Sequence, residues 1–223
     1  MLENLKNNLI VSCQPVVGGP MDSPAIIAAM AKASVAGGAA GVRVEGVANV
    51  AAARAAVTCP IIGIVKVALE TSAVKITPFA QNVVDLISAG ADIVAVDATD
   101  RDRPETIGSA IEITKQHGGL FMADCSNLKD GVNAQRLGAD ILGTTMSGYT
   151  ERTTPEEPDL ELVGEFSRLG TFVIAEGRYN TPDLAARAIR SGADAVVVGS
   201  AITRLEVVTR WFRDAVDEVG VKR

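Results

Sequence analysis

The segment SAGADIVAVDAT, residues 88–99, joins the end of a helix to a buried strand through a short turn. We expect Gly90 to end the helix in the left-handed conformation, so that Ala91 and Asp92 lead into the apolar run that follows. The same Gly-Ala-Asp turn recurs at residues 138–140 and 192–194, and a weaker copy, Gly-Ala-Ala, lies at 38–40. Two strand–helix units fit between successive copies, which predicts that the turns precede strands 2, 4, 6 and 8 of a repeating fold.

Strand-like and helix-like segments alternate along the whole chain of 223 residues. The predicted strands are 9–14, 40–45, 61–66, 92–97, 120–124, 140–145, 172–176 and 195–199. A last helix is expected at 205–219, and an irregular loop at 147–158 follows strand 6. Eight strands exceed the five or six of a doubly wound sheet, so we expect a (β/α)8 TIM barrel of the α/β class, in one domain spanning residues 1–223.

Composition narrows the class of protein further. Hydrophobic residues make up 48% and aromatic residues only 4%, which is typical of parallel strands covered by Ala-rich helices. A net charge of −6 argues against nucleic acid as a partner. The N-terminal residues predict no signal peptide, no membrane-length apolar run occurs, and three cysteines without a CxxC pair suit a reducing, cytoplasmic setting. A lone histidine, His117, is expected at a helix end and excludes a His-rich metal site.

Charged residues stand at the predicted strand ends, where the active sites of such barrels lie. Lys66 ends the buried run IIGIVK, and burial beside the cationic Arg43 would lower its pKa and free a neutral amine. That amine could act as a general base or form a Schiff base. Asp124 and Glu176 end strands 5 and 7, where each could take part in catalysis or form a structural ion pair. Arg43 could stabilise negative charge or pair with Glu45.

The ends of strands 7 and 8 predict a phosphate site. Loops in these positions form the recurrent phosphate cradle of the fold, where glycine lets backbone amides approach the anion. The alternative is that these glycines only make turns. The residues proposed for the cradle are Gly177, Arg178, Gly199, Ser200 and Arg204.

Together these residues favour proton transfer at a carbon next to a carbonyl, on a small phosphorylated substrate. The residues call for no metal and no other cofactor. Two rivals remain open: a Schiff-base aldolase that uses Lys66 as nucleophile, and a phosphosugar-binding barrel without catalysis.

The chain also resembles a known family, the N-acetylmannosamine-6-phosphate 2-epimerases. The resemblance runs from residue 9 to about residue 204 through the stretches LIVSCQP, GVRVEG, PIIGIVK, ITPF, DATDRDRP, MADCS, RLGADILGTTMSGYT, TPEEPDL, VIAEGRYNTP and VVVGSAITR. It implies interconversion of N-acetylmannosamine 6-phosphate and N-acetylglucosamine 6-phosphate in sialic acid and amino-sugar catabolism, without a cofactor and commonly by a homodimer.

The resemblance implies catalytic roles for Lys66, Glu176, Asp124 and Arg43, with substrate contacts from Gln14 and the cradle loops. In this family the lysine is usually followed by an arginine and an acidic residue, whereas Val67 and Ala68 follow it here. On the last helix, Trp211-Phe212 could anchor an interface or pack against the barrel, and we expect packing.

Overall fold

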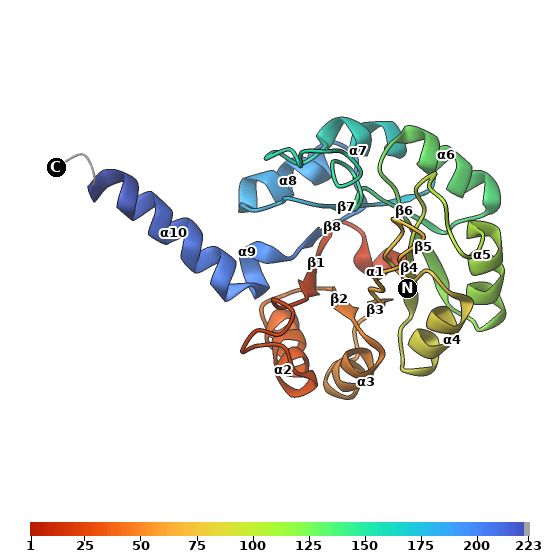
Figure 1. The fold of residues 1–223 in the computed structure, drawn as a ribbon, viewed down its shortest axis with the longest axis horizontal. Coiled ribbons are helices and arrows are strands. Elements are labelled where there is room, and N and C mark those ends of the chain that lie inside the picture. The colour runs from red at the N-terminus through yellow and green to blue at the C-terminus, as the bar shows by residue number, and fades with distance from the viewer. Residues whose placement is uncertain (221–223) are drawn as a thin grey trace.

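The computed structural model describes residues 1–220 and has a closed barrel of parallel strands in the order β1 to β8, with β8 paired to β1 (Figure 1). The TIM barrel expected from the sequence is confirmed. Its strands are β1 (Asn8–Cys13), β2 (Gly41–Glu45), β3 (Ile61–Ile64), β4 (Ile93–Asp97), β5 (Leu120–Asp124), β6 (Ile141–Gly143), β7 (Phe172–Glu176) and β8 (Ala195–Val198). Its helices are α1 (Leu2–Leu5), α2 (Pro24–Ala36), α3 (Val47–Ala56), α4 (Ala80–Ser88), α5 (Ile107–Gln116), α6 (Leu128–Leu137), α7 (Leu160–Ser167), α8 (Pro182–Arg190), α9 (Ser200–Thr203) and α10 (Leu205–Gly220). The last three residues of the expected domain, 221–223, lie outside the described part.

Strand ends differ from the expectation by two residues at most. Strand β6 ends two residues early, and so does β3. This strand ends at Ile64 because the chain then turns, and Lys66 forms an antiparallel bridge with Ile76. The amide of Thr77 donates to Val65 O at 2.7 Å, and that of Asp97 donates to Ile76 O at 3.1 Å. The returning segment therefore fills the space between β3 and β4 at the mouth of the barrel.

The Gly-Ala-Asp turns do more than end helices. Gly90, Gly138 and Gly192 have φ values of 104°, 94° and 105°, as a left-handed helix end requires. In addition, each following aspartate accepts a hydrogen bond from the first part of the preceding strand. Asp92 accepts from Ile61 N, Asp140 from Phe121 N and Asp194 from Val173 N, each at 2.9 Å. The repeat thus fixes the register of β4, β6 and β8 against their predecessors.

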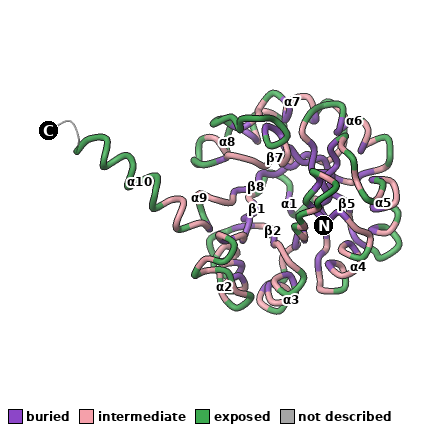
Figure 2. The backbone as a smooth tube through the Cα atoms, viewed as in Figure 1, coloured by how far each residue is buried: buried purple, intermediate pink, exposed green. Residues whose placement is uncertain are grey.

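The interior of the barrel is filled by branched side chains of alternate strand positions, and α1 closes its N-terminal end with the fully buried Leu5. A second apolar cluster lies between the strands and the surrounding helices, and Figure 2 shows the buried strands inside a partly exposed helical ring. His117 caps the C-terminus of α5, which confirms its predicted place at a helix end.

Helix α10 does not join this ring. It leaves the barrel beside α9 and projects outward between α8 and α2 (Figure 1). None of its residues is buried, and Phe212 is 72% exposed. The expected packing of Trp211-Phe212 against the barrel is therefore wrong for Phe212, because the helix that carries it turns away, whereas Trp211 is 38% exposed and lines the cavity at the mouth of the barrel. No helix within residues 1–220 has the length and apolar character needed to cross a bilayer.

Candidate active site

A cavity of about 630 Å³ opens at the C-terminal ends of the strands. Its lining includes all of the predicted site residues except Asp124, whose carboxylate lies below the surface of the cavity. Strands far apart in sequence contribute side chains to one volume because the barrel closes. The members from the prediction are Gln14, Arg43, Lys66, Glu176, Gly177, Arg178, Gly199, Ser200 and Arg204.

Lys66 reaches the cavity from the loop after β3. Its Nζ donates to Oε1 of Gln14 at 2.7 Å, and Gln14 in turn donates from Nε2 to Ser12 Oγ at 2.8 Å. The cavity walls reduce hydration of the ammonium and lower the pKa of Lys66, and the positive charges of Arg43 and Arg204 lower it further. These conditions favour the neutral amine that a general base requires.

Arg43 lies at the centre of the site, between two carboxylates. Its Nη2 is 2.6 Å from Asp124 Oδ2 and its Nη1 is 2.7 Å from Glu176 Oε2. Burial opposes the charge of the guanidinium, but the two carboxylates outweigh that cost and raise the pKa of Arg43. Arg43 therefore forms its ion pairs with Asp124 and Glu176 and not with Glu45. Glu45 instead accepts a hydrogen bond from the backbone amide of Lys66 at 3.2 Å.

Glu176 differs from Asp124 in access and in proton affinity. The side chain of Glu176 is 14% exposed and borders the cavity, whereas that of Asp124 is fully buried. Burial raises the pKa of Glu176 to about 7, and Asp124 adds to this increase while Arg43 opposes it. A carboxyl group with this pKa can hold or release a proton near neutral pH.

Thr145 belongs to the same cluster, although sequence reasoning did not select it. Its Oγ1 lies 2.6 Å from Asp124 Oδ1 and 3.3 Å from Glu176 Oε2. The hydroxyl therefore helps to hold both carboxylates in place. Its position just after β6 was the signal that could have identified it.

The loops after β7 and β8 form the part of the cavity wall where the sequence predicts a phosphate site. Gly177 has a φ of 111°, a conformation that favours glycine, and Gly199 precedes the short helix α9. Within the described residues, the amides of Ser200 and Ala201 have no hydrogen-bond acceptor. Arg204 donates from Nε to Gln14 O at 2.9 Å, which keeps its positive charge at this end of the cavity. This arrangement suits an anion.

Arg178 lines the cavity, but its guanidinium is engaged elsewhere. Nη1 donates to Ser147 O at 2.7 Å and Nε donates to Glu157 O at 2.8 Å. The guanidinium carbon also lies 5.3 Å from the ring centre of Tyr149. Arg178 thus holds the loop between β6 and α7 over the mouth, a contact that sequence reasoning did not foresee. Among residues 1–220, no cluster of three His, Cys, Asp or Glu side chains offers a metal site.

Comparison with known proteins identifies the family of this chain. Residues 27–218 match the model of the NanE family, described as "Putative N-acetylmannosamine-6-phosphate epimerase". The chain belongs to the NanE family. It is 58% identical over 218 residues to a relative from Glaesserella parasuis with the corresponding 2-epimerase description, covering 98% of this chain and 94% of the relative. A similarly described relative from Haemophilus influenzae is 56% identical over 216 residues, covering 97% and 95%.

A solved NanE structure supports the same assignment. The N-acetylmannosamine-6-phosphate 2-epimerase from Clostridium perfringens superposes with a TM-score of 0.93 at 39% identity, covering 96% of each chain. A thiamine phosphate pyrophosphorylase from Pyrococcus furiosus shares only the fold, at 20% identity and a TM-score of 0.62. The family resemblance expected from the sequence is confirmed.

Proposed function

We propose that this NanE family member interconverts N-acetylmannosamine 6-phosphate and N-acetylglucosamine 6-phosphate, a step of sialic acid and amino-sugar catabolism. The observation that carries the proposal is the pairing, in one cavity, of a lysine of lowered pKa with a glutamate of pKa about 7. Inversion of a carbon next to a carbonyl needs one group that removes a proton and another that supplies one. The cavity places a lysine whose ammonium form is weakened by burial near a glutamate that titrates at about pH 7.

The reaction begins with the open-chain sugar, in which the C1 carbonyl makes the C2 proton acidic. Neutral Lys66 removes this proton, and the charge moves onto the C1 oxygen as an enolate that carries the acetamido group on C2. Glu176 then delivers a proton to C2 on the opposite face, which inverts the carbon. The reverse reaction uses the same two groups with their roles exchanged. Between turnovers Lys66 loses its extra proton to solvent and Glu176 regains one from solvent, which restores the starting state.

The choice of Glu176 over Asp124 as the second acid rests on access. Glu176 borders the cavity, whereas Asp124 is fully buried behind Arg43 and Thr145. We therefore assign Asp124 to positioning, through Arg43 and through its effect on the pKa of Glu176. Arg43 keeps both carboxylates in place and adds positive charge near the developing enolate.

The phosphate is assigned to the cradle of Gly177, Gly199, Ser200 and Arg204. The unpaired amides at the start of α9 and the fixed charge of Arg204 support this role. Because Arg178 is held by loop carbonyls, we assign it to closing the mouth over the substrate.

A proton NMR time course of N-acetylmannosamine 6-phosphate with the protein in D2O tests the proposal. N-acetylglucosamine 6-phosphate carrying deuterium at C2 is the expected product. An unchanged spectrum at high protein concentration would refute it. Borohydride treatment with substrate provides a second test, since covalent labelling of Lys66 would favour the aldolase.

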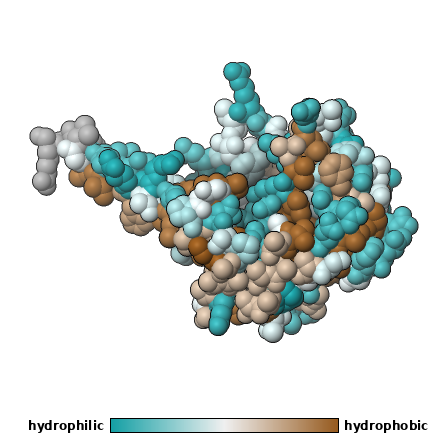
Figure 3. Space-filling view, turned by 60° about the horizontal axis from the view of Figure 1, so that its bottom comes forward, coloured by the Kyte–Doolittle hydropathy of each residue, from teal (hydrophilic) through white to brown (hydrophobic). Residues whose placement is uncertain are grey.

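We further propose that the chain forms one domain and acts in the cytoplasm as a homodimer joined through α10. The free thiols of Cys13, Cys59 and Cys125 suit a reducing compartment. Helix α10 forms an arm that projects from the barrel, and exposed apolar side chains recur along it at helical spacing (Figure 3). These side chains are Leu205, Phe212, Val216 and Val219. An unpaired stripe of this kind needs a partner surface.

The ring of helices indicates where such a partner surface lies. Helix α8 buries only Ala188, and Figure 1 shows no helix of residues 1–220 lying along the barrel between α8 and α2. A (β/α)8 barrel ordinarily has a final helix in that position. We place the α10 arm of a second copy beside α8, which makes the same patch of both copies the interface.

A further inference from the structure

The cavity has a second end, opposite the phosphate cradle. In a closed barrel of eight strands, β4 lies across from β8, so Arg101 after β4, and the segment after β3 that packs beside β4, face the loop that carries Ser200. This far wall consists of Ala73, Lys75, Ile76 and Arg101. Neither the proton transfer nor phosphate binding uses these residues.

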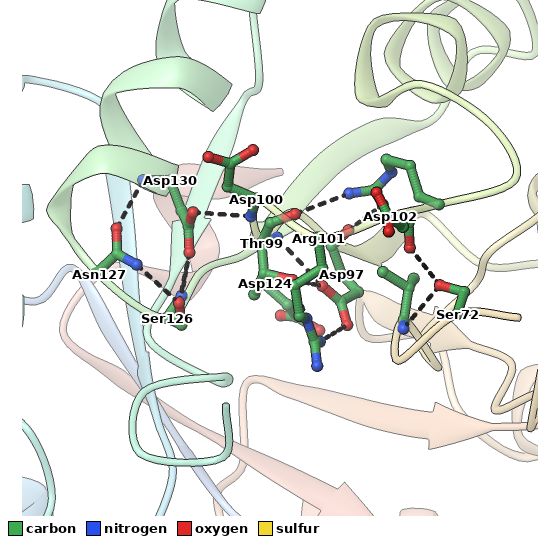
Figure 4. A network of polar contacts seen from close by, with 12 residues as sticks. Ser72, Asp97, Thr99, Asp100, Arg101, Asp102, Asp124, Ser126, Asn127 and Asp130 are labelled. Carbon is green, nitrogen blue, oxygen red and sulfur yellow. Dashed lines mark hydrogen bonds and ion pairs between the residues drawn. The ribbon is translucent and has the colours of Figure 1, made fainter. Parts of the chain in front are cut away.

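A chain of backbone contacts ties the far wall to Lys66. Lys66 forms its bridge with Ile76, and the amide of Asp97 donates to Ile76 O. Asp97 is the register partner of Asp124 on the neighbouring strand, so both carboxylates face the barrel interior. Arg101 binds Asp97 directly, with Nη2 2.6 Å from Oδ2 (Figure 4). Arg101 is therefore placed beside the reacting centre, on the side away from the phosphate.

Two nitrogens of the Arg101 guanidinium are bound by neighbouring side chains, and the third remains available as a hydrogen-bond donor. Nε donates to Thr99 Oγ1 at 2.7 Å, and Nη2 is bound to the fully buried Asp97. Within the described residues, Nη1 has no partner, and the side chain remains 24% exposed to the cavity. A planar guanidinium fixed at two nitrogens is well prepared to donate from the third.

The geometry of the substrate indicates what this donor meets. When the C6 phosphate occupies the cradle and C2 lies at Lys66, the amide on C2 extends toward the far wall. We propose, on the basis of the proposed function, that Arg101 donates from Nη1 to the N-acyl carbonyl oxygen of the substrate, with the acyl methyl against Ala73 and Ile76. Arg101 is thus a specificity-determining residue that makes binding depend on the acyl group.

Lys75 lies on the same wall but suits this role less well. It is exposed, and among residues 1–220 no side-chain contact holds its ammonium. Fixing a free lysine on a neutral carbonyl costs side-chain entropy that the bound Arg101 has already lost. Lys75 therefore provides the alternative that the experiment must separate.

The test uses two unreactive ligands that share the phosphate and differ in the acyl group. N-acetylglucosaminitol 6-phosphate carries the amide, whereas glucitol 6-phosphate does not. Calorimetric dissociation constants are measured for wild type, Arg101→Gln, Lys75→Gln and the matched surface variant Arg136→Gln. Loss of a charge-assisted hydrogen bond predicts that Arg101→Gln weakens the acetamido ligand by about 10- to 100-fold and glucitol 6-phosphate by less than about 3-fold.

A second variant protects the test against misfolding. Arg101→Gln leaves Asp97 buried without its cation, so Asp97→Asn/Arg101→Gln removes that charge and should show the same selective loss. Equal losses for both ligands, no loss, or a selective loss confined to Lys75→Gln would overturn the assignment of Arg101. A wild-type protein that binds neither ligand would instead refute the proposed function, and the inference with it.

Discussion

Nζ of Lys66 donates to Oε1 of Gln14 at 2.7 Å, so the lysine that lines the cavity has a neutral amide as its hydrogen-bond partner. A carboxylate in that place would hold the ammonium form and raise the pKa of the lysine. The two carboxylates of the site are bound to Arg43 instead. The amide can orient the lysine without preventing the loss of its proton.

Replacing Lys66 with methionine should remove the base while preserving the shape of the cavity. We expect the rate of C2 deuterium incorporation to fall by about 10²- to 10⁴-fold. Binding of N-acetylglucosaminitol 6-phosphate should remain within a few-fold of wild type. Lys129→Met, on the exposed surface, is the matched control. Near-normal exchange in Lys66→Met would assign the base to another group.

The pH dependence follows from the two proton-exchanging groups. The active form carries one proton on the pair, so activity should rise as pH increases through about 7, the pKa of Glu176. It should fall again as pH passes the lowered pKa of Lys66, below the usual lysine value. Asp124→Asn removes a charge that raises the pKa of Glu176, and we expect the acid limb of kcat/KM to move to lower pH. An unmoved limb would show that Glu176 does not set it.

Arg43→Met should destabilise the fold, because it leaves Asp124 and Glu176 buried without a cation. Loss of one member of a buried ion cluster costs about 3–5 kcal/mol of unfolding free energy. Glu176 would keep the burial that raises its pKa and would lose the cation that lowers it, so the loss should be smaller in acid and should grow as pH rises. Urea unfolding at pH 5 and pH 8 measures this difference. Arg213→Met, which breaks an exposed pair on α10, should cost at most about 1 kcal/mol.

Arg178→Met should loosen the loop over the mouth without affecting the barrel. Two hydrogen bonds from Arg178 to Ser147 and Glu157 carbonyls would be lost. We expect amide hydrogen exchange within residues 147–158 to accelerate by about tenfold or more, while strand amides are unchanged. Arg190→Met, which removes an exposed pair on α8, should leave the loop unaltered. Unchanged exchange in Arg178→Met would show that other contacts hold the loop.

The α10 stripe predicts how the dimer can be separated. Phe212→Asp/Val216→Asp places two charges among apolar side chains that a second copy would cover. Sedimentation should show a dimer for wild type and a monomer for this variant, with unchanged circular dichroism. Val132→Asp, an exposed valine on α6, is the control. A wild-type monomer would refute the homodimer.

The barrel could be predicted from sequence because its signals are local. Gly90 and its repeats mark helix ends by the conformation that only glycine adopts easily, and the apolar runs behind them mark strands. The place of α10 could not be predicted in this way. The spacing of Phe212 and Val216 indicates an apolar face, but not whether that face covers this barrel or another copy.

The active site, like the fold, could be predicted only where the signal is local in the sequence. Strand-end positions identified Lys66 and Glu176, whereas the contacts of Arg43 with strands β5 and β7 depend on how the barrel closes. The role of Arg178 was hidden for a different reason. Its acceptors are backbone carbonyls, which every residue has, so no pattern of side chains in the sequence predicts them.

The proposed phosphate cradle joins residues that follow the first and last strands of the barrel. Thr203 Oγ1 donates to Ser12 O at 2.7 Å, and Arg204 Nε donates to Gln14 O, which joins residues from the two ends of the sequence. A ribosome must therefore release β8 before the cradle can exist, and the growing chain passes through synthesis without an anion site. Once the cradle forms, a bound phosphate would favour the joined ends over their separation, so the substrate itself would act late in folding to hold the chain closed.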